Sequence, residues 1–180
     1  MNRELLEEQL SGLPLYVYAW IDPRELEFTP RVRKICQAEC PRYNQTWACP
    51  PAVGEVEQCR EKCLGHGACL LIGTVVETED ISDMETTLAT RGDHEAVTEQ
   101  VGDLLKAQGI TPYILSTEAC AICERCAWLD GQPCRFPEKM VSSMEAYGMV
   151  VTEVCKANDL PYNYGKNTIA YTSCVLFDKK

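Results

Sequence analysis

Four cysteines lie within fifteen residues in the segment CAICERCAWLDGQPCRF, and their spacing is typical of ligands to a metal centre. They are Cys120, Cys123, Cys126 and Cys134, called the C-terminal tetrad below. A C-x2-C-x2-C run is characteristic of bacterial iron–sulfur clusters, because thiolates separated by two residues can turn toward a common centre. Zinc also accepts four thiolates, but its usual pattern is two separated C-x2-C pairs. The tetrad therefore favours a [4Fe–4S] cluster and leaves zinc as the alternative.

A second group of cysteines stands in the segment KICQAECPRYNQTWACPP. Cys36, Cys40 and Cys49 are called the N-terminal trio below, and proline follows two of the three. A proline stiffens the loop and lacks an N–H group that would compete for the sulfur. The fourth position is open: Cys59 or Cys63 supplies it, a group other than cysteine supplies it, or one iron stays accessible to substrate as a Lewis acid.

The trio predicts a second cluster, so that the chain binds one or two [4Fe–4S] clusters. Trp47 and Tyr43, in the same loop, are expected to cover a cluster held by the trio and to tune its reduction potential by lowering the local dielectric. Two alternatives remain for the trio. It supports its own loop, or it contributes to one site shared with the tetrad.

The five other cysteines have a simpler interpretation as packing residues. Cys59 and Cys63 fall on the apolar face of a helix expected just after the trio, where a free cysteine packs as a small hydrophobic side chain. Ligation of a cluster is their second interpretation. Cys69 lies at the start of an apolar strand, Cys155 within a helix and Cys174 inside the last strand, and all three are expected in the core.

Other chemically active side chains are few. With two histidines in the chain, any metal site must be mostly thiolate, which favours zinc or iron–sulfur chemistry over copper, nickel or magnesium. His66 stands between glycines and is expected in a solvated turn, and His94 is expected to be exposed in the first turn of a helix. Glu145 is a candidate acid/base or a helix cap, and the structural role is preferred.

Composition and charge argue against several classes of protein. The 180 residues carry a formal charge of −10, whereas nucleic acids and anionic membrane surfaces attract clustered Lys and Arg. No run of eighteen apolar residues could form a membrane span, and the segment MNRELLEEQLSGL is too polar for a signal peptide. We expect a cytoplasmic protein that binds neither nucleic acid nor membrane, and whose cysteines a reducing compartment leaves available to metals.

The elements expected to position these cysteines alternate between strand and helix. Strands are expected over 13–20, 68–76, 110–116 and 167–178, and helices over 30–36, 54–65, 93–109 and 143–159. The continuous apolar run 68–76 predicts a strand buried on both faces, and with the next helix and strand it has the length of a βαβ unit with a parallel strand pair. The predicted fold is α/β or α+β, a single domain over 1–180 with a layered sheet of about four strands and cysteine-rich loops.

The two cysteine segments, in this order, resemble a known protein family. The matching stretches are RVRKICQAECPRYNQTWACPP and CAICERCAWLDGQPCRFPEKMVSSMEAYG, and the resemblance extends from Pro30 to the final strand. The family is the cysteine-rich "predicted metal-binding protein" family, a domain of unknown function common in anaerobic archaea and bacteria. The resemblance implies metal binding, through iron–sulfur clusters at the trio and the tetrad, and it implies no particular reaction.

We therefore expect an iron–sulfur protein with an electron-transfer or redox role in anaerobic metabolism. Its partner would be a redox protein, and the acidic surface would steer a partner that presents a basic patch. Two alternatives belong to other classes: an enzyme or activating factor that uses an open iron at the trio, and a zinc-stabilised binding module. A homodimer that shares a sheet edge is compatible with the sequence.

Overall fold

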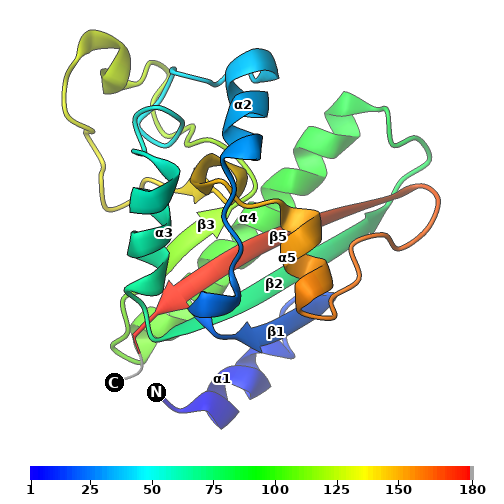
Figure 1. Ribbon diagram of the computed structural model, residues 1–180. Helices are drawn as coiled ribbons and strands as arrows, with labels where there is room; N and C mark the ends of the chain where they lie inside the picture. Colours follow the sequence, from blue (N-terminus) through cyan, green and yellow to red (C-terminus); the bar gives the residue numbers. More distant parts are fainter. Residues whose placement is uncertain (179–180) are drawn as a thin grey trace.

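The computed structural model describes residues 1–178 as a mixed β-sheet with helices on both faces (Figure 1). The α-helices are α1 (Arg3–Leu10), α2 (Pro30–Glu39), α3 (Val56–Leu64), α4 (Met84–Ala107) and α5 (Val151–Ala157). The strands are β1 (Val17–Ile21), β2 (Ala68–Glu77), β3 (Tyr113–Ser116), β4 (Ser142–Ser143) and β5 (Thr168–Phe177). Three short 3-10 helices are η1 (Pro23–Glu25), η2 (Ala127–Asp130) and η3 (Glu145–Tyr147). The predicted α/β class is confirmed.

The strand order within the described residues is β1-β2-β5-β3-β4. β2 and β5 form the longest ladder, which is antiparallel and runs from the pair Ala68–Phe177 to the pair Glu77–Thr168. β1 is antiparallel to β2, β3 is antiparallel to β5, and β4 is parallel to β3. This part of the chain thus has five strands where about four were expected, because β4 has two residues and leaves no period-2 pattern in the sequence.

The predicted direct pairing of the two strands that flank α4 is wrong. β2 and β3 do run in the same direction, since both are antiparallel to β5, but β5 lies between them. The last seven residues of β5 are buried, so a central position covers both of its apolar faces. A helical crossover indicates the direction of the second strand, and it does not indicate whether a third strand is inserted between the two.

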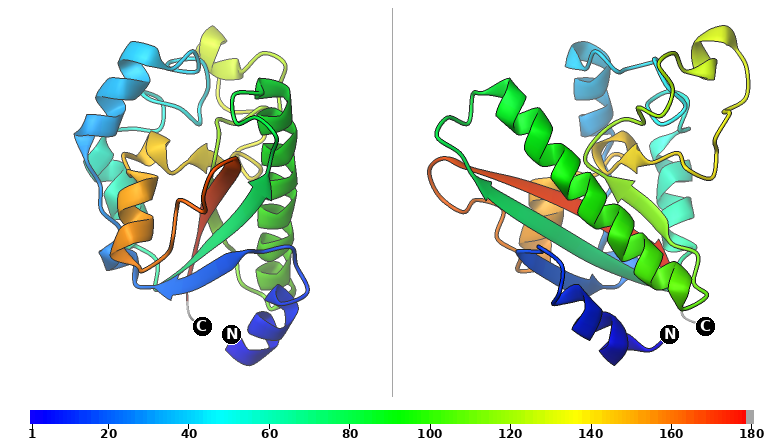
Figure 2. Two further views of the ribbon diagram at one scale, coloured as in Figure 1. Left: turned by 90° about the vertical axis from the view of Figure 1, so that its right-hand side faces the viewer. Right: turned by 180° about the vertical axis from the view of Figure 1, so that it is seen from behind.

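Helices cover both faces of the sheet (Figure 2). On one face, Leu10 of α1 and Leu105 of α4 pack with Leu70 of β2. On the other face, Cys63 of α3 and Leu71 of β2 belong to a second core, together with buried residues of η3 and α5. Adjacent residues of β2 therefore face different cores, which confirms that this strand is buried on both sides. Burial of each such leucine contributes roughly 2 kcal/mol to stability.

The three cysteines assigned to the core are found there. Cys69, Cys155 and Cys174 are between 0 and 2% exposed. The Sγ atoms of Cys69 and Cys174 lie 3.0 Å apart between β2 and β5. Cys59 and Cys63, on α3, are also fully buried in the same core, as the packing interpretation predicted.

The expectation that His94 is an exposed residue of a first helical turn is wrong. α4 begins at Met84, ten residues earlier, and His94 is 1% exposed against the sheet. Its Nδ1 lies 2.9 Å from Thr74 Oγ1 on β2, and its Nε2 lies 2.7 Å from Ser173 Oγ on β5. Burial lowers the pKa of His94 to about 4, although the nearby Glu95 carboxylate acts in the opposite direction. The imidazole is therefore a neutral structural link between α4 and two strands.

The two cysteine-rich segments, 40–55 and 117–141, lie side by side at one end of the sheet in both views of Figure 2. None of the helices in residues 1–178 has the length and apolar character needed to cross a membrane. The sheet thus serves as a scaffold from which both cysteine loops project at the same end.

Candidate metal centre

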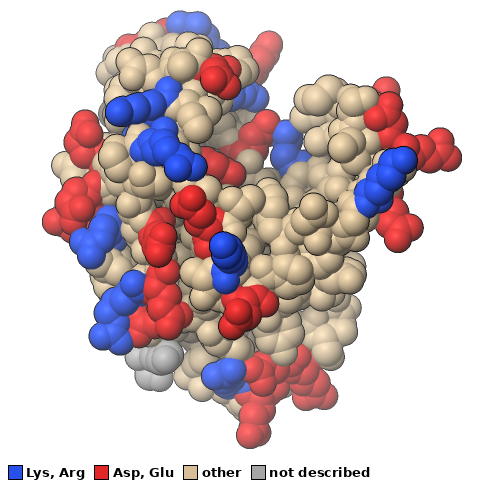
Figure 3. Space-filling view, turned by 45° about the vertical axis from the view of Figure 1, so that its right-hand side comes forward, with Lys and Arg blue, Asp and Glu red and all other residues tan. Residues whose placement is uncertain are grey.

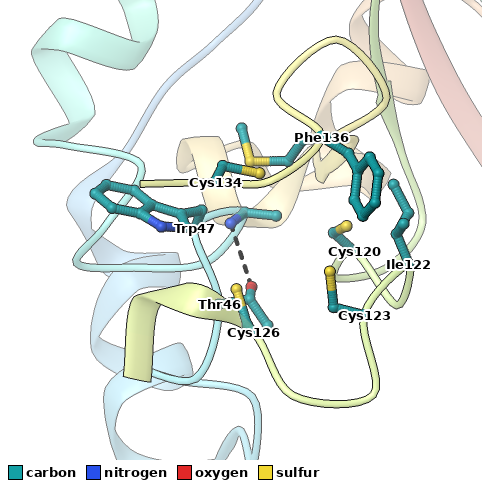
Figure 4. A pocket seen from close by; sticks show the side chains of 10 residues that line it. Thr46, Trp47, Cys120, Ile122, Cys123, Cys126, Cys134 and Phe136 are labelled. Carbon is teal, nitrogen blue, oxygen red and sulfur yellow. Dashed lines mark hydrogen bonds between the residues drawn. The ribbon is translucent and has the colours of Figure 1, made fainter. Parts of the chain in front are cut away.

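The four cysteines of the C-terminal tetrad line one small hollow (Figure 4). Each is partly exposed. The remaining lining residues are mostly apolar and come from both cysteine loops: Thr46, Trp47, Ala48, Ile122, Phe136 and Met140. A set of four sulfur donors in apolar surroundings is the chemistry that iron–sulfur clusters and structural zinc both use.

Short-range contacts fold the tetrad loop back on itself. Cys126 precedes η2, and its carbonyl oxygen accepts a hydrogen bond from the Leu129 N–H at 3.2 Å. Gly131 then adopts a left-handed conformation, with φ of 64°, which is a conformation that glycine tolerates best. The chain reverses at this glycine and returns Cys134 to the hollow. Sequence spacing predicted this outcome, since a glycine turn separates the third and fourth cysteines.

Helix α4 holds the first residues of the tetrad loop. The Oε1 atom of Glu95 accepts hydrogen bonds from the backbone N–H and the hydroxyl of Thr117, and Arg91 forms a 2.7 Å ion pair with Glu118. These contacts connect the end of β3 to the helix two residues before Cys120. The position of the first tetrad cysteine is therefore set by the sheet and α4 together.

Two tryptophans join the tetrad loop to the trio loop. The Trp47 indole N–H donates to the Gln132 carbonyl at 2.9 Å, and the Trp128 indole N–H donates to Asn44 Oδ1 at 2.9 Å. The two rings meet edge to face with centroids 4.7 Å apart. Each loop therefore supplies a tryptophan whose indole donates to the other loop. Trp47, which was expected to cover the trio, instead lines the hollow of the tetrad.

The N-terminal trio is assembled at the end of α2. Cys36 lies in the last turns of the helix, Cys40 is its C-terminal cap, and Cys49 is buried in the following loop. The Cys40 N–H donates to the Cys36 carbonyl at 3.2 Å. Burial raises the pKa of both the Cys36 and the Cys49 thiols, with a further increase from the nearby Cys40 thiolate. Binding of a metal to these thiols would therefore release protons.

The two cysteine groups are adjacent in space. Both Cys40 and Cys120 lie near enough to Cys49 for their thiolates to raise its pKa further. Cys49 thus has neighbours in both cysteine groups. The sequence left open how the two groups are related, and the structure brings them together at one end of the molecule.

The surroundings of the trio are locally basic although the whole chain is acidic. Residues 30–51 contain four basic residues and one acidic residue. Figure 3 shows basic and acidic side chains together on the upper part of the molecule and mainly acidic ones along its lower edge. Arg33 lowers the pKa of Cys36, and its buried Nε–H has no hydrogen-bond partner among the residues that the structure describes. A buried, unpaired donor beside the trio fits an anionic sulfur-containing group at this place.

The extra ligands considered for the trio point elsewhere. Cys59 accepts a hydrogen bond from Arg33 at 3.2 Å and packs in the sheet core, and Cys63 packs beside it. Neither lines the hollow of the tetrad or the hollow next to the trio. Their placement favours the packing interpretation.

The hollow within the tetrad measures about 20 Å³, which is close to the space that one buried water needs. Within residues 1–178, no three His, Cys, Asp or Glu side chains are gathered closely enough to hold a metal ion. Metal binding at cysteine sites is commonly coupled to local folding. We therefore expect the exposed part of the tetrad loop to move when a metal group is bound.

Fold and site together define an α/β protein with paired cysteine loops, of the metal-binding class. Residues 19–177 match the model of the family described as "Predicted metal-binding protein (DUF2284)", and the chain belongs to this family. Neither the curated proteins nor the solved structures include a significant match to the chain.

Several residues of the site could not be predicted from local patterns in the sequence. Asn44 and Trp128 are 84 residues apart in the sequence, and no local pattern predicts the hydrogen bond between them. Phe136 and Met140 line the tetrad hollow from a loop without regular structure. Glu145 was recognised as a candidate, but its place beside the trio depends on how η3 packs against α2.

Proposed function

We propose that this chain is an iron–sulfur protein in which the tetrad and the trio each hold a [4Fe–4S] cluster and which transfers single electrons. The observation that carries the proposal is the convergence of seven cysteines, from two distant segments, at one end of the sheet. A bound [4Fe–4S] cluster supplies one-electron oxidation and reduction at a potential set by its surroundings. Two adjacent clusters would give the protein an internal electron path.

The residues around the cysteines support this role. The apolar lining of the tetrad hollow would lower the local dielectric, and the basic surroundings of the trio would favour an anionic cluster. Cys40 is exposed, so a cluster bound there would lie near the surface, where a partner protein could exchange electrons with it. We propose a redox protein as that partner, and the anaerobic cytoplasm as the setting.

The test is electron paramagnetic resonance of anaerobically purified protein before and after reduction. The account predicts a silent oxidised protein and signals of reduced [4Fe–4S] clusters after reduction. Because the two cysteine groups are adjacent, the fully reduced spectrum should show magnetic coupling between clusters and differ from the sum of two isolated signals. A protein that takes up no electrons and gives no such signal would contradict the proposal.

A zinc-stabilised binding module is the second candidate, and the small size of the tetrad hollow favours it. A space of about 20 Å³ is closer to the size of a single ion than to that of a four-iron cluster. Zinc would join the loops without redox chemistry. A colourless protein with stoichiometric zinc would support this candidate against the first.

A further inference from the structure

The N-terminal trio has three cysteines and no assigned fourth ligand. A [4Fe–4S] cluster has four irons to be ligated, and the trio supplies thiolates for three of them. Cys59 and Cys63 are fully buried in the sheet core, and their packing there would be lost if either turned toward the trio. The tetrad cysteines already line a hollow of their own. If the protein supplies the fourth ligand, that ligand is therefore a side chain of another type.

A second hollow, of about 440 Å³, lies directly beside the trio. Cys36, Cys40, Glu39, Glu145 and Tyr162 are among the residues that line it. Glu145 is half-buried, whereas Glu39 is exposed.

The backbone fixes Glu145 in this position. Glu145 begins η3, which packs against α2, the helix that carries Cys36. Gly148 ends η3 with φ of 91°, and its carbonyl accepts a 2.8 Å hydrogen bond from the N–H of Thr29, the N-terminal cap of α2. A Cβ atom on Gly148 would lie 3.1 Å from the Thr29 carbonyl oxygen. This glycine therefore permits the close approach that places Glu145 beside the trio.

The electrostatics of Glu145 are those of a carboxylate without a cation. Its own backbone N–H and Ser143 are its hydrogen-bond partners. No Lys, Arg or His forms an ion pair with it within residues 1–178. Carboxylate is an established ligand of protein iron.

We propose that the Glu145 carboxylate is the fourth ligand of the N-terminal centre, which it would bind from the side of the hollow shared with Cys36 and Cys40. This inference rests on the proposed iron–sulfur function. A carboxylate in this position would make one iron chemically distinct from those held by thiolate alone. It would also place that iron next to the hollow, whose size is in the range of small-molecule sites, roughly 300–1,000 Å³.

The test is ⁵⁷Fe Mössbauer spectroscopy with iron analysis on anaerobically reconstituted full-length protein. The wild type should show one oxygen-ligated iron, roughly one in eight if two four-iron clusters are present. Glu145→Gln, which has nearly the same shape, should lose that signal and about one iron per chain. Glu145→Cys should restore the iron with an all-thiolate spectrum. Glu39→Gln, in the same hollow, is the matched control and should resemble the wild type.

The results distinguish ligation by Glu145 from a structural role of this residue. Loss of iron in Glu145→Gln with recovery in Glu145→Cys supports ligation, because both variants lack the carboxylate and one of them carries a thiolate. Loss in both variants would indicate a structural role and overturn the inference. Unchanged spectra in both would overturn it as well. Wild-type protein without iron and sulfide would instead contradict the proposed function itself, so the two failures are distinguishable.

Discussion

Acidification should destabilise this protein through one buried histidine, His94. The imidazole is 1% exposed and is held by Thr74 and Ser173, whose hydroxyl groups lie 2.9 and 2.7 Å from its two nitrogens. Burial lowers its pKa from 6.5 to about 4, and Glu95 is the charged neighbour that opposes this shift. The folded state therefore prefers the neutral ring, whereas the unfolded chain takes up a proton below pH 6.5.

The size of the effect follows from the two pKa values. The stabilisation from the neutral ring is fully present above pH 6.5 and is lost progressively as the pH falls toward 4. When the pH falls from 7.5 to 5, the histidine takes up a proton in the unfolded chain but not in the folded state. This lowers the free energy of unfolding by about 2 kcal/mol. For a protein of this length, 2 kcal/mol corresponds to a decrease in melting temperature of roughly 4–8 °C.

The assay is urea denaturation of wild type and of His94→Gln at several pH values between 5 and 7.5. Carboxylates and any bound cluster contribute equally to both proteins, so the difference between their unfolding free energies isolates the histidine. That difference should be largest at pH 7.5 and should shrink by about 2 kcal/mol at pH 5. A difference that stays constant across this range would refute the assignment of a buried neutral imidazole.

Other predictions concern the ligands, the core and the loop contacts. Cys126→Ala should lower the iron per chain by roughly half, measured by metal analysis after anaerobic purification, since one four-ligand set would be incomplete. Unchanged iron would remove Cys126 from the ligand set. Cys174→Ala should keep all iron and lower the unfolding free energy by on the order of 1 kcal/mol in urea, because it removes a buried sulfur from the core. Loss of iron in that variant would contradict its packing role. Trp128→Phe should remove the hydrogen bond to Asn44, reduce stability by about 1 kcal/mol and speed proteolytic cleavage within 117–141; an unchanged cleavage rate would show that the contact does not hold the loops together. Gly148→Ala should lower the melting temperature, by an amount equivalent to roughly 1–3 kcal/mol, because a side chain there meets left-handed strain and the Thr29 carbonyl. An unchanged melting temperature would contradict that constraint.

Local patterns in the sequence were sufficient for several features of the fold. The apolar run in β2 predicted a strand buried on both faces, and the cysteines in apolar segments predicted core positions, because burial depends on hydrophobicity that is visible residue by residue. The insertion of β5 between β2 and β3 could not be predicted. Strand adjacency is decided by packing among segments far apart in the chain, and the last strand could occupy either the edge or the centre.

The sequence likewise predicts one part of the candidate site and not the other. The spacing of the tetrad and its glycine turn were enough to predict that Cys120 and Cys134 line one hollow. The contacts of Trp47 with the tetrad loop, and of Glu145 with the trio, arise from tertiary packing between loops and could not be inferred from spacing. The true start of α4 was also missed, because the N-terminal cap Asp83 precedes a polar first turn without apolar periodicity. That error placed His94 in solvent rather than against the sheet.

The central claim is that the two cysteine groups bind iron–sulfur clusters, and elemental analysis tests it most directly. Protein purified without oxygen should contain iron and acid-labile sulfide in equal amounts, with about eight of each per chain if both groups are loaded. About four of each would indicate that one group is loaded. One zinc per chain without labile sulfide would contradict the account.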